Sequence, residues 1–213
     1  FTDSNLENLN ALIAAKGSVV IDGAMSTALE SLGCNLNDSL WSAKILAEDP
    51  EKIYEVHRRY YEAGADVAIT ASYQASEAGF KAKGIGAEKA AELIALSVTL
   101  ARRARDTVLA AHPEKRNSPL LVAGSVGPYG AYLADGSEYT GNYTLTRDKY
   151  RAFHGLRLKA LAEAGADLLA IETQPKPEEA AVVAQMAEED GLSAWVTFSL
   201  ADAEHTADGT PVT

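Results

Sequence analysis

The sequence predicts an α/β fold of the (β/α)8 TIM-type barrel class, with about the first five βα units present. Two observations predict it. Apolar segments alternate with helical patterns along the 213 residues, and polar residues gather where the apolar segments end. Strands that are apolar throughout are typical of a parallel sheet covered by helices. Polar strand ends favour a barrel, because barrel active sites lie at the carboxyl ends of the strands.

One sequence motif, in which a helix is followed by a glycine and then by a strand, occurs twice in the chain. Residues 62–70 read EAGADVAIT, and residues 163–173 read EAGADLLAIET. Each copy follows an amphipathic helical pattern, and Asp49 is expected to cap the first of these helices. Gly64 and Gly165 come directly after the two helices, at the position where a left-handed residue commonly ends a helix.

The predicted elements follow in chain order. Apolar runs predict five strands, at residues 18–22, 66–72, 120–126, 167–173 and 193–202. Helical periodicity predicts helices near residues 24–32, 50–63, 87–111, 147–164 and 177–190. No linker, low-complexity segment or charge block divides the chain, so residues 1–213 are predicted to form a single barrel domain.

A doubly wound nucleotide-binding fold is the competing architecture. Such a fold would carry a G-x-G-x-x-G motif after its first strand. The first strand here leads into IDGAMSTALE, which does not match that motif. The later stretch AGSVGPYG spaces its glycines differently and runs into a long loop. A complete barrel needs eight strands and typically about 250 residues, so the chain is expected to hold about two-thirds of one, incomplete at the C-terminus.

Charge and composition exclude several classes of partner. The formal net charge is −11, which argues against binding to nucleic acid or to an anionic membrane surface. No apolar run is long enough to span a bilayer, and the first residues lack the pattern of a signal peptide. The single cysteine excludes an intrachain disulfide, and this predicts a cytoplasmic protein.

Two carboxylates at strand ends are the leading site candidates. Asp22 closes the first predicted strand and Glu172 closes the fourth, where an unpaired charge is costly to bury. Together at one barrel mouth they suit a substrate ammonium group, and the alternative for each is a helix cap. Residues 124–144 form a long, tyrosine-rich loop, which predicts a folded lid or a wall of the pocket.

The histidines and the cysteine form no recognisable metal or nucleophile motif. The four histidines have no metal-ligand spacing, and His57 and His154 are interpreted as structural or surface residues. His205 follows the last predicted strand, and nothing further marks it as a site residue. Cys34 is interpreted as a small, partly buried apolar residue in a turn.

Five longer motifs carry a resemblance to a known family. They read DGAMSTALESLGCNLNDSLWSAKIL, ITASYQASEAGF, LLVAGSVGPYGAYLADGSEYTGNY, AGADLLAIETQP and FSLADAEHTADGTP. These motifs resemble the homocysteine S-methyltransferase family, in its branch that uses S-methylmethionine. The resemblance implies a barrel that moves a methyl group from S-methylmethionine or S-adenosylmethionine to homocysteine, giving methionine. It also implies zinc held by three cysteines in segments beyond Thr213, so no metal ligand and no catalytic residue is expected within this chain.

The resemblance further implies which residues bind the amino acid. The expected substrate-binding positions are Asp22, Gly23, Ala24, Gln74, Ser125 and Glu172. Asp22 and Gly23 match the part of the family site that holds the amino-acid end of homocysteine, and Glu172 matches the carboxylate that pairs with its ammonium group. Ala24 is included because backbone N–H groups around Gly23 and Ala24 suit a substrate carboxylate. Two alternatives stay open: betaine or a methylfolate as methyl donor, or a truncated, non-catalytic fragment. Unpaired sheet edges also predict self-association.

Overall fold

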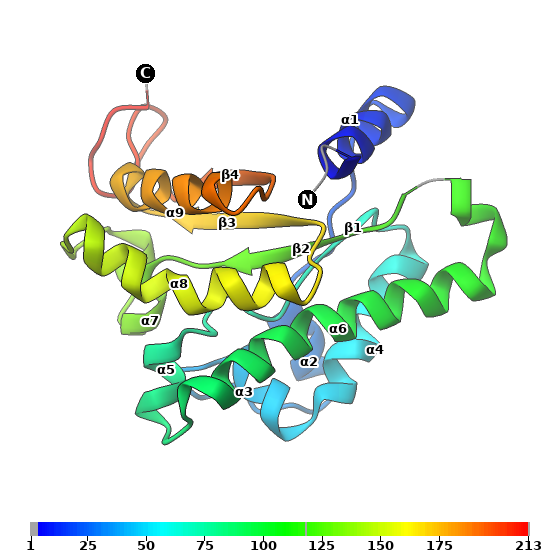
Figure 1. Ribbon diagram of the computed structural model, residues 1–213, viewed down its shortest axis with the longest axis horizontal. Helices are drawn as coiled ribbons and strands as arrows, with labels where there is room; N and C mark the ends of the chain where they lie inside the picture. The colour runs from blue at the N-terminus through cyan, green and yellow to red at the C-terminus, as the bar shows by residue number, and fades with distance from the viewer. Residues whose placement is uncertain (1–3, 118, 213) are drawn as a thin grey trace.

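The computed structural model describes residues 4–117 and 119–212, which contain a four-stranded, entirely parallel sheet (Figure 1). The strands lie side by side in the order β1 (Val67–Ile69), β2 (Leu121–Val126), β3 (Leu168–Gln174) and β4 (Ala194–Phe198). Strands that are neighbours in the chain are therefore also neighbours in the sheet. This sequential order is typical of a barrel, whereas a doubly wound fold reverses its strand order part-way along the sheet.

The helices confirm the predicted alternation. Those that the structure describes are α1 (Ser4–Lys16), α2 (Met25–Ser31), α3 (Ser42–Glu48), α4 (Pro50–Ala63), α5 (Glu77–Ala82), α6 (Ala87–Ala111), α7 (Tyr129–Leu133), α8 (Arg147–Glu163) and α9 (Pro177–Glu189). The predicted helices correspond to α2, α4, α6, α8 and α9, and their bounds differ from the prediction by one residue at most. Helices α1, α3, α5 and α7 were not predicted; α3, α5 and α7 are too short to show a periodic pattern. No helix in the described ranges is long and apolar enough to cross a membrane.

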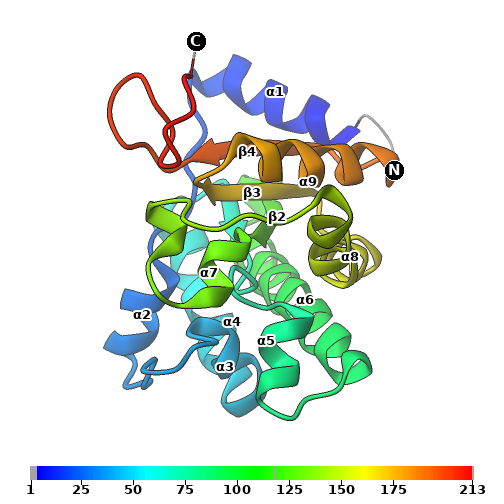
Figure 2. The same cartoon turned by 90° about the vertical axis from the view of Figure 1, so that its left-hand side faces the viewer.

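The sheet separates two apolar layers. Helices α4, α6 and α8 pack on one face, and α1 lies on the opposite side (Figure 2). On the α1 side, Leu12 is 2% exposed and packs against inward-facing residues of three strands, among them Val67, Leu121 and Leu168. In a closed barrel these residues would face the interior, so α1 covers the interior face near the amino ends of the strands.

The predicted first strand, residues 18–22, is reduced to a single parallel bridge between Ile21 and Val67. Within the described residues no strand pairs with its outer side, and Val20 and Ile21 are each 52% exposed. A strand paired on one side only is weakly held, which explains the short pairing. The predicted strand at 193–202 is likewise shortened, because the chain turns away after Phe198.

The two glycines of the repeat end their helices as predicted. Gly64 has φ of +110° and Gly165 has φ of +83°, both in the left-handed region that favours glycine. Asp49 lies at the amino-terminal cap of α4, but its side chain makes no capping hydrogen bond, so the capping prediction is wrong. Pro50 occupies the first turn and needs no N–H partner there, which leaves one fewer donor for a cap to satisfy.

The aspartates of the repeat have the same role in both copies. The Asp66 backbone N–H donates to Val20 O at 2.7 Å, and its Oδ2 accepts the Val20 N–H at 3.1 Å. Asp167 repeats this pattern with Val122, at 2.9 Å and 2.7 Å. Each aspartate therefore fixes the start of its own strand against the preceding one.

Candidate functional site

A cavity of about 300 Å³ lies at the carboxyl ends of the strands. Five of the six predicted substrate-binding residues line it: Asp22, Gly23, Ala24, Ser125 and Glu172. They come from three separate segments of the chain, so the fold brings together residues that are up to 150 positions apart.

Gln74 is the exception among the predicted residues. It lines a second hollow of about 420 Å³, together with Trp41 and Glu138. Its Nε2 donates to Ala131 O at 3.1 Å, while its Oε1 is buried and accepts no hydrogen bond from the described part of the chain. The Gln74 side chain therefore holds the loop after β2 and does not reach the first cavity.

Glu172 lies at the end of β3, directly beside Ser125 on β2. The Ser125 hydroxyl donates to Glu172 Oε1. Burial of the carboxylate raises the pKa of Glu172 above its usual value; the Ser125 hydrogen bond opposes this shift, and the charge of Asp22 adds to it. The surroundings of Glu172 thus disfavour its charged form.

Two buried hydroxyl groups, those of Thr70 and Ser72, support Ser125. Its backbone N–H donates to Thr70 Oγ1 at 2.9 Å, and Ser72 Oγ donates to Ser125 O at 2.8 Å. The Thr70 and Ser72 hydroxyls are 2.7 Å apart. Because Ser72 uses its one hydrogen on Ser125, Thr70 is the donor in that pair. This network fixes the Ser125 backbone from the neighbouring chain segment, so its hydroxyl is held toward Glu172.

Asp22 is nearly buried and does not cap a helix. Its side chain is 3% exposed, and Oδ2 accepts the Ile69 N–H at 3.0 Å. The amino-terminal cap of α2 is Ala24, without a side-chain capping bond, so the helix-cap alternative does not hold for Asp22. The carboxylate lies 3.8 Å from Nδ1 of His57, a residue that the sequence placed only inside a helix.

The turn after Asp22 is tightly packed against α4. A Cβ atom on Gly23 would lie 2.7 Å from the Tyr60 hydroxyl oxygen, closer than real Cβ contacts come. That hydroxyl donates to Ala24 O at 3.2 Å. Glycine at this position therefore allows α4 to approach and hold the turn at the cavity wall.

A second buried polar network lies behind the loops that follow β1 and β2. Arg157 is 1% exposed and donates to Tyr73 O and Gly127 O, both at 2.7 Å. It also contacts His154 Nδ1 at 2.8 Å, while His154 Nε2 lies 2.8 Å from Glu179 Oε1. Because arginine only donates, His154 must accept at Nδ1 and donate to Glu179 from Nε2.

Burial sets the protonation of this network. It lowers the pKa of His154 to about 4, despite the opposing effect of Glu179, so the imidazole is neutral near pH 7. Burial also lowers the pKa of Arg157 to about 10, which still leaves the guanidinium charged. The interpretation of His154 as structural agrees with this position. Its partner Arg157 is three residues away on the same helix, but Glu179 is 25 positions away and could not be predicted from spacing.

The loop after β2 is folded, and its residues Ala134, Gly136 and Glu138 line the second hollow, not the cavity beside Asp22. It contains α7, and Tyr129 packs against Tyr143 at a ring-centroid distance of 5.5 Å. Glu179 holds both residues, accepting the Tyr129 N–H and the Tyr143 hydroxyl at 2.6 Å each. Burial, followed by the Glu179 charge, raises the pKa of Tyr143, so the phenol stays protonated and donates.

The remaining candidates from the sequence lie away from this cavity. Cys34 follows α2, is half-buried and packs against the core, and burial raises the pKa of its thiol. His205 lies 2.9 Å from Asp202 on an exposed turn after β4. Among the described residues, no three His, Cys, Asp or Glu side chains come together in a way that could hold a metal ion.

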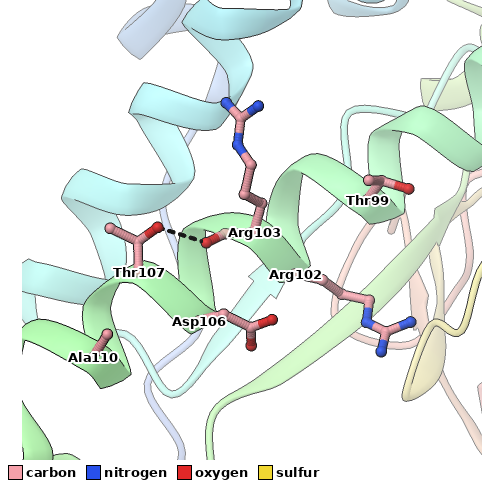
Figure 3. A pocket seen from close by; sticks show the side chains of 6 residues that line it. All are labelled: Thr99, Arg102, Arg103, Asp106, Thr107 and Ala110. Carbon is pink, nitrogen blue, oxygen red and sulfur yellow. Dashed lines mark hydrogen bonds between the residues drawn. The ribbon is translucent and has the colours of Figure 1, made fainter.

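A larger hollow, about 560 Å³, lies on the surface of α6 (Figure 3). Its two arginines, Arg102 and Arg103, point away from one another and are already bound to the protein. Arg102 donates to Ala164 O at 3.1 Å, and Arg103 donates to Glu51 at 2.6 Å. Because the arginines do not converge, we do not interpret this hollow as a binding site.

Several known proteins are similar in sequence to this chain. Residues 19–213 match the family model described as homocysteine S-methyltransferase. The chain is 54% identical over 205 residues to the homocysteine S-methyltransferase of Escherichia coli (strain K12), covering 96% of this chain and 66% of that protein. It is also 54% identical over 195 residues to homocysteine S-methyltransferase YbgG of Bacillus subtilis (strain 168), covering 91% of this chain and 62% of that protein. The chain thus spans slightly less than two-thirds of the length of these curated relatives.

Solved structures extend the comparison to the fold. The metallated form of the homocysteine methyltransferase MmuM from Escherichia coli superposes with a TM-score of 0.92 at 53% identity, covering 96% of this chain and 71% of that chain. The oxidized form of the same protein matches with the same TM-score. Together with the sequential parallel sheet, this match confirms the predicted barrel class. The chain belongs to the homocysteine S-methyltransferase family.

Proposed function

We propose that this chain forms the amino-acid-binding part of an enzyme that transfers a methyl group to homocysteine and so produces methionine. The observation that carries the proposal is the pair of carboxylates, Asp22 and Glu172, lining one cavity at the carboxyl ends of parallel strands. Neither lies within ion-pair distance of a lysine or arginine in the described ranges. Two such charges create a site for a substrate cation, and the amino acid homocysteine carries one.

The cavity suits the two charged ends of an amino acid. Glu172 pairs with the ammonium group, and Asp22 supports the same charge from the opposite segment. Ser125 fixes the Glu172 carboxylate through its hydroxyl. The backbone around Gly23 and Ala24 supplies N–H groups for the substrate carboxylate. These residues bind and orient homocysteine, so that its side-chain sulfur is presented for methyl transfer.

The methyl donor in the proposal is S-methylmethionine, or alternatively S-adenosylmethionine. The homocysteine sulfur forms the new S–CH3 bond as the sulfonium S–CH3 bond breaks. The donor leaves as a neutral thioether, and the homocysteine thiol proton is released. Because the leaving group is neutral, it needs no general acid, which agrees with the lack of a catalytic triad motif in the sequence.

Zinc is proposed as the metal of the whole enzyme, but the residues described here do not fit a zinc centre. They contain no cluster of three ligand side chains, and Cys34 is packed against the core. One of the matched Escherichia coli structures is a metallated form. When bound, zinc would supply activation of a thiol by favouring its thiolate. The ligands are proposed to be cysteines in family segments beyond residue 213.

A full-length version tests the proposal, meaning this chain extended by the segments that its relatives carry beyond the match. We expect it to form methionine from homocysteine and S-methylmethionine, as measured by mass spectrometry. Betaine and methylfolate, offered in parallel, test the alternative donors. Binding of homocysteine without turnover by any donor would support the non-catalytic alternative, and failure to bind homocysteine would contradict the proposal.

Residues 1–213 alone form the matched control. Val196, Phe198 and Leu200, in and beyond edge strand β4, are 36%, 40% and 56% exposed. Exposed apolar strand edges favour pairing between copies, so we expect self-association of residues 1–213 together with loss of methyl transfer. Size-exclusion chromatography with light scattering measures the first, and the methionine assay measures the second. A stable monomer with full turnover would contradict this expectation.

A further inference from the structure

A fully buried histidine lies directly behind Asp22. His57 is 0% exposed, and neither ring nitrogen makes a hydrogen bond within the part of the chain that the structure describes. Nδ1 lies 3.8 Å from Asp22 Oδ2. A buried polar group without a partner costs free energy, so its presence here needs a reason.

Nδ1 is the ring nitrogen that faces Asp22, and the chemistry of the pair decides whether it carries a hydrogen. An ionised carboxylate offers only acceptors, so an attractive contact requires a hydrogen on Nδ1. The same oxygen, Oδ2, also accepts the Ile69 N–H at 3.0 Å. Oδ1 makes no hydrogen bond with the described residues, and Asp22 lines the cavity. The arrangement therefore has one oxygen held by the protein and one available to a ligand.

We propose that His57 is a positioning residue for homocysteine binding: its Nδ1–H holds Asp22 Oδ2, so that Oδ1 faces the substrate ammonium group. This inference rests on the proposed function. In the structure the contact is longer than a hydrogen bond. Contacts of this kind are often long in the unliganded protein and tighten in the substrate complex.

Helix α4 is well placed for this role. One turn beyond His57, the Tyr60 hydroxyl donates to Ala24 O and packs against Gly23. Tyr61, on the same helix, is fully buried and donates to Leu121 O at 2.7 Å. The helix is thus fixed to strand β2 and to the turn that carries Asp22, so a small shift of the ring is enough to close the contact.

Three substitutions separate a positioning role from simple space filling. Asn places its amide nitrogen near the position of the histidine Nδ1, Gln places its amide near Nε2, and Leu fills the space without a donor. In the full-length version we expect His57→Asn to retain homocysteine affinity within about twofold. His57→Leu and His57→Gln should each weaken binding by about three- to tenfold, because the lost hydrogen bond acts on the substrate only through the position of Asp22.

The measurements are the homocysteine Kd by titration calorimetry and the melting temperature of each variant. His112→Asn is the matched control, because His112 is partly exposed after the carboxyl end of α6, does not line the cavity, and in the described residues its side chain pairs with Glu114. Normal binding by His57→Leu, or equal weakening by all three variants, would overturn the inference while leaving the proposed function intact. Failure of the unsubstituted protein to bind homocysteine would overturn both. If His57→Leu does not fold, the comparison of Asn with Gln still decides the question.

Discussion

The acidic residues at the two ends of the parallel strands differ in how completely their charges are paired. At the amino ends, Asp66 accepts the Val20 N–H and lies 2.5 Å from the Lys16 ammonium nitrogen. Asp167 accepts the Val122 N–H and lies 3.3 Å from Arg105. Each has both a backbone donor and a basic side chain.

At the carboxyl ends the pairing is incomplete. Glu172 accepts one hydroxyl hydrogen from Ser125, and Asp22 accepts one backbone N–H from Ile69. No lysine or arginine in the described ranges forms an ion pair with either. This difference indicates that the acidic side chains with a structural role are fully paired within the protein. The acidic side chains at the expected site of a cationic ligand are not. The following predictions test that division.

The largest expected effect is on substrate binding. Glu172→Gln in the full-length version removes the charge that pairs with the homocysteine ammonium group. Loss of a charge-assisted hydrogen bond of this kind costs about 1.5–3 kcal/mol, which is roughly ten- to a hundredfold in Kd. Titration calorimetry checks this. An unchanged Kd would show that Glu172 has only a structural role.

At the amino ends of the strands, we expect a substitution to lower stability and to leave substrate binding unchanged. Asp66→Ala leaves the Val20 N–H and the Lys16 ammonium without their acceptor, so we expect a loss of about 1–3 kcal/mol in unfolding free energy. Urea denaturation measures it, with Asp66→Asn as a milder control that keeps one acceptor. Homocysteine affinity should stay unchanged in the folded variants. A large loss of affinity without loss of stability would break the division between the two ends.

The pH dependence of stability gives a smaller but directional effect. Because the pKa of Glu172 is raised in the folded protein, the folded state binds more protons than the unfolded state above about pH 4.5. This contribution is fully present below that pH and is lost as pH rises through the raised pKa. Glu172→Gln should therefore stabilise the protein at neutral pH and have no such effect at pH 4. Thermal melts at the two pH values check the sign.

The smallest effect is expected at Cys34, which belongs to neither end. Cys34→Ser in the full-length version should change the unfolding free energy by less than about 1 kcal/mol, because the residue is only half-buried in a turn. The metal content should not change, since the side chain joins no ligand cluster in the described residues. Loss of one metal equivalent, measured by elemental analysis, would contradict the interpretation of Cys34 as a packing residue.

Local patterns in the sequence predict much of this structure, and contacts between distant segments account for most of the rest. The helix bounds follow from apolar periodicity and from glycines such as Gly64. Asp22 and Glu172 could be selected because a carboxylate at the end of an apolar strand is costly unless it has a purpose. A full strand at residues 18–22 was predicted, but only one bridge forms there. Strand propensity alone does not hold a segment that has a paired strand on one side only.

The supporting residues could not be found in this way. His57 lies on a helical stripe that any core residue could occupy, and only the fold brings it to Asp22, 35 positions earlier in the chain. The contact of His154 with Glu179 likewise joins two helices through side chains 25 positions apart. For His57, the sequence offers a single indication: this histidine lies among apolar positions of a helix.

The repeated Gly-Ala-Asp sequence, residues 64–66 and 165–167, also affects which changes in chain length the fold tolerates. The first copy follows the 14-residue helix α4 and the second follows the 17-residue helix α8, yet both aspartates join their strand to the preceding one in the same way. Strand alignment is therefore set by a residue at the strand itself and does not depend on helix length. A one-residue slip between β2 and β3 would turn Ser125 from the cavity to the helix layer. Insertions and deletions within the helices can thus accumulate among relatives while the alignment of the site residues is preserved.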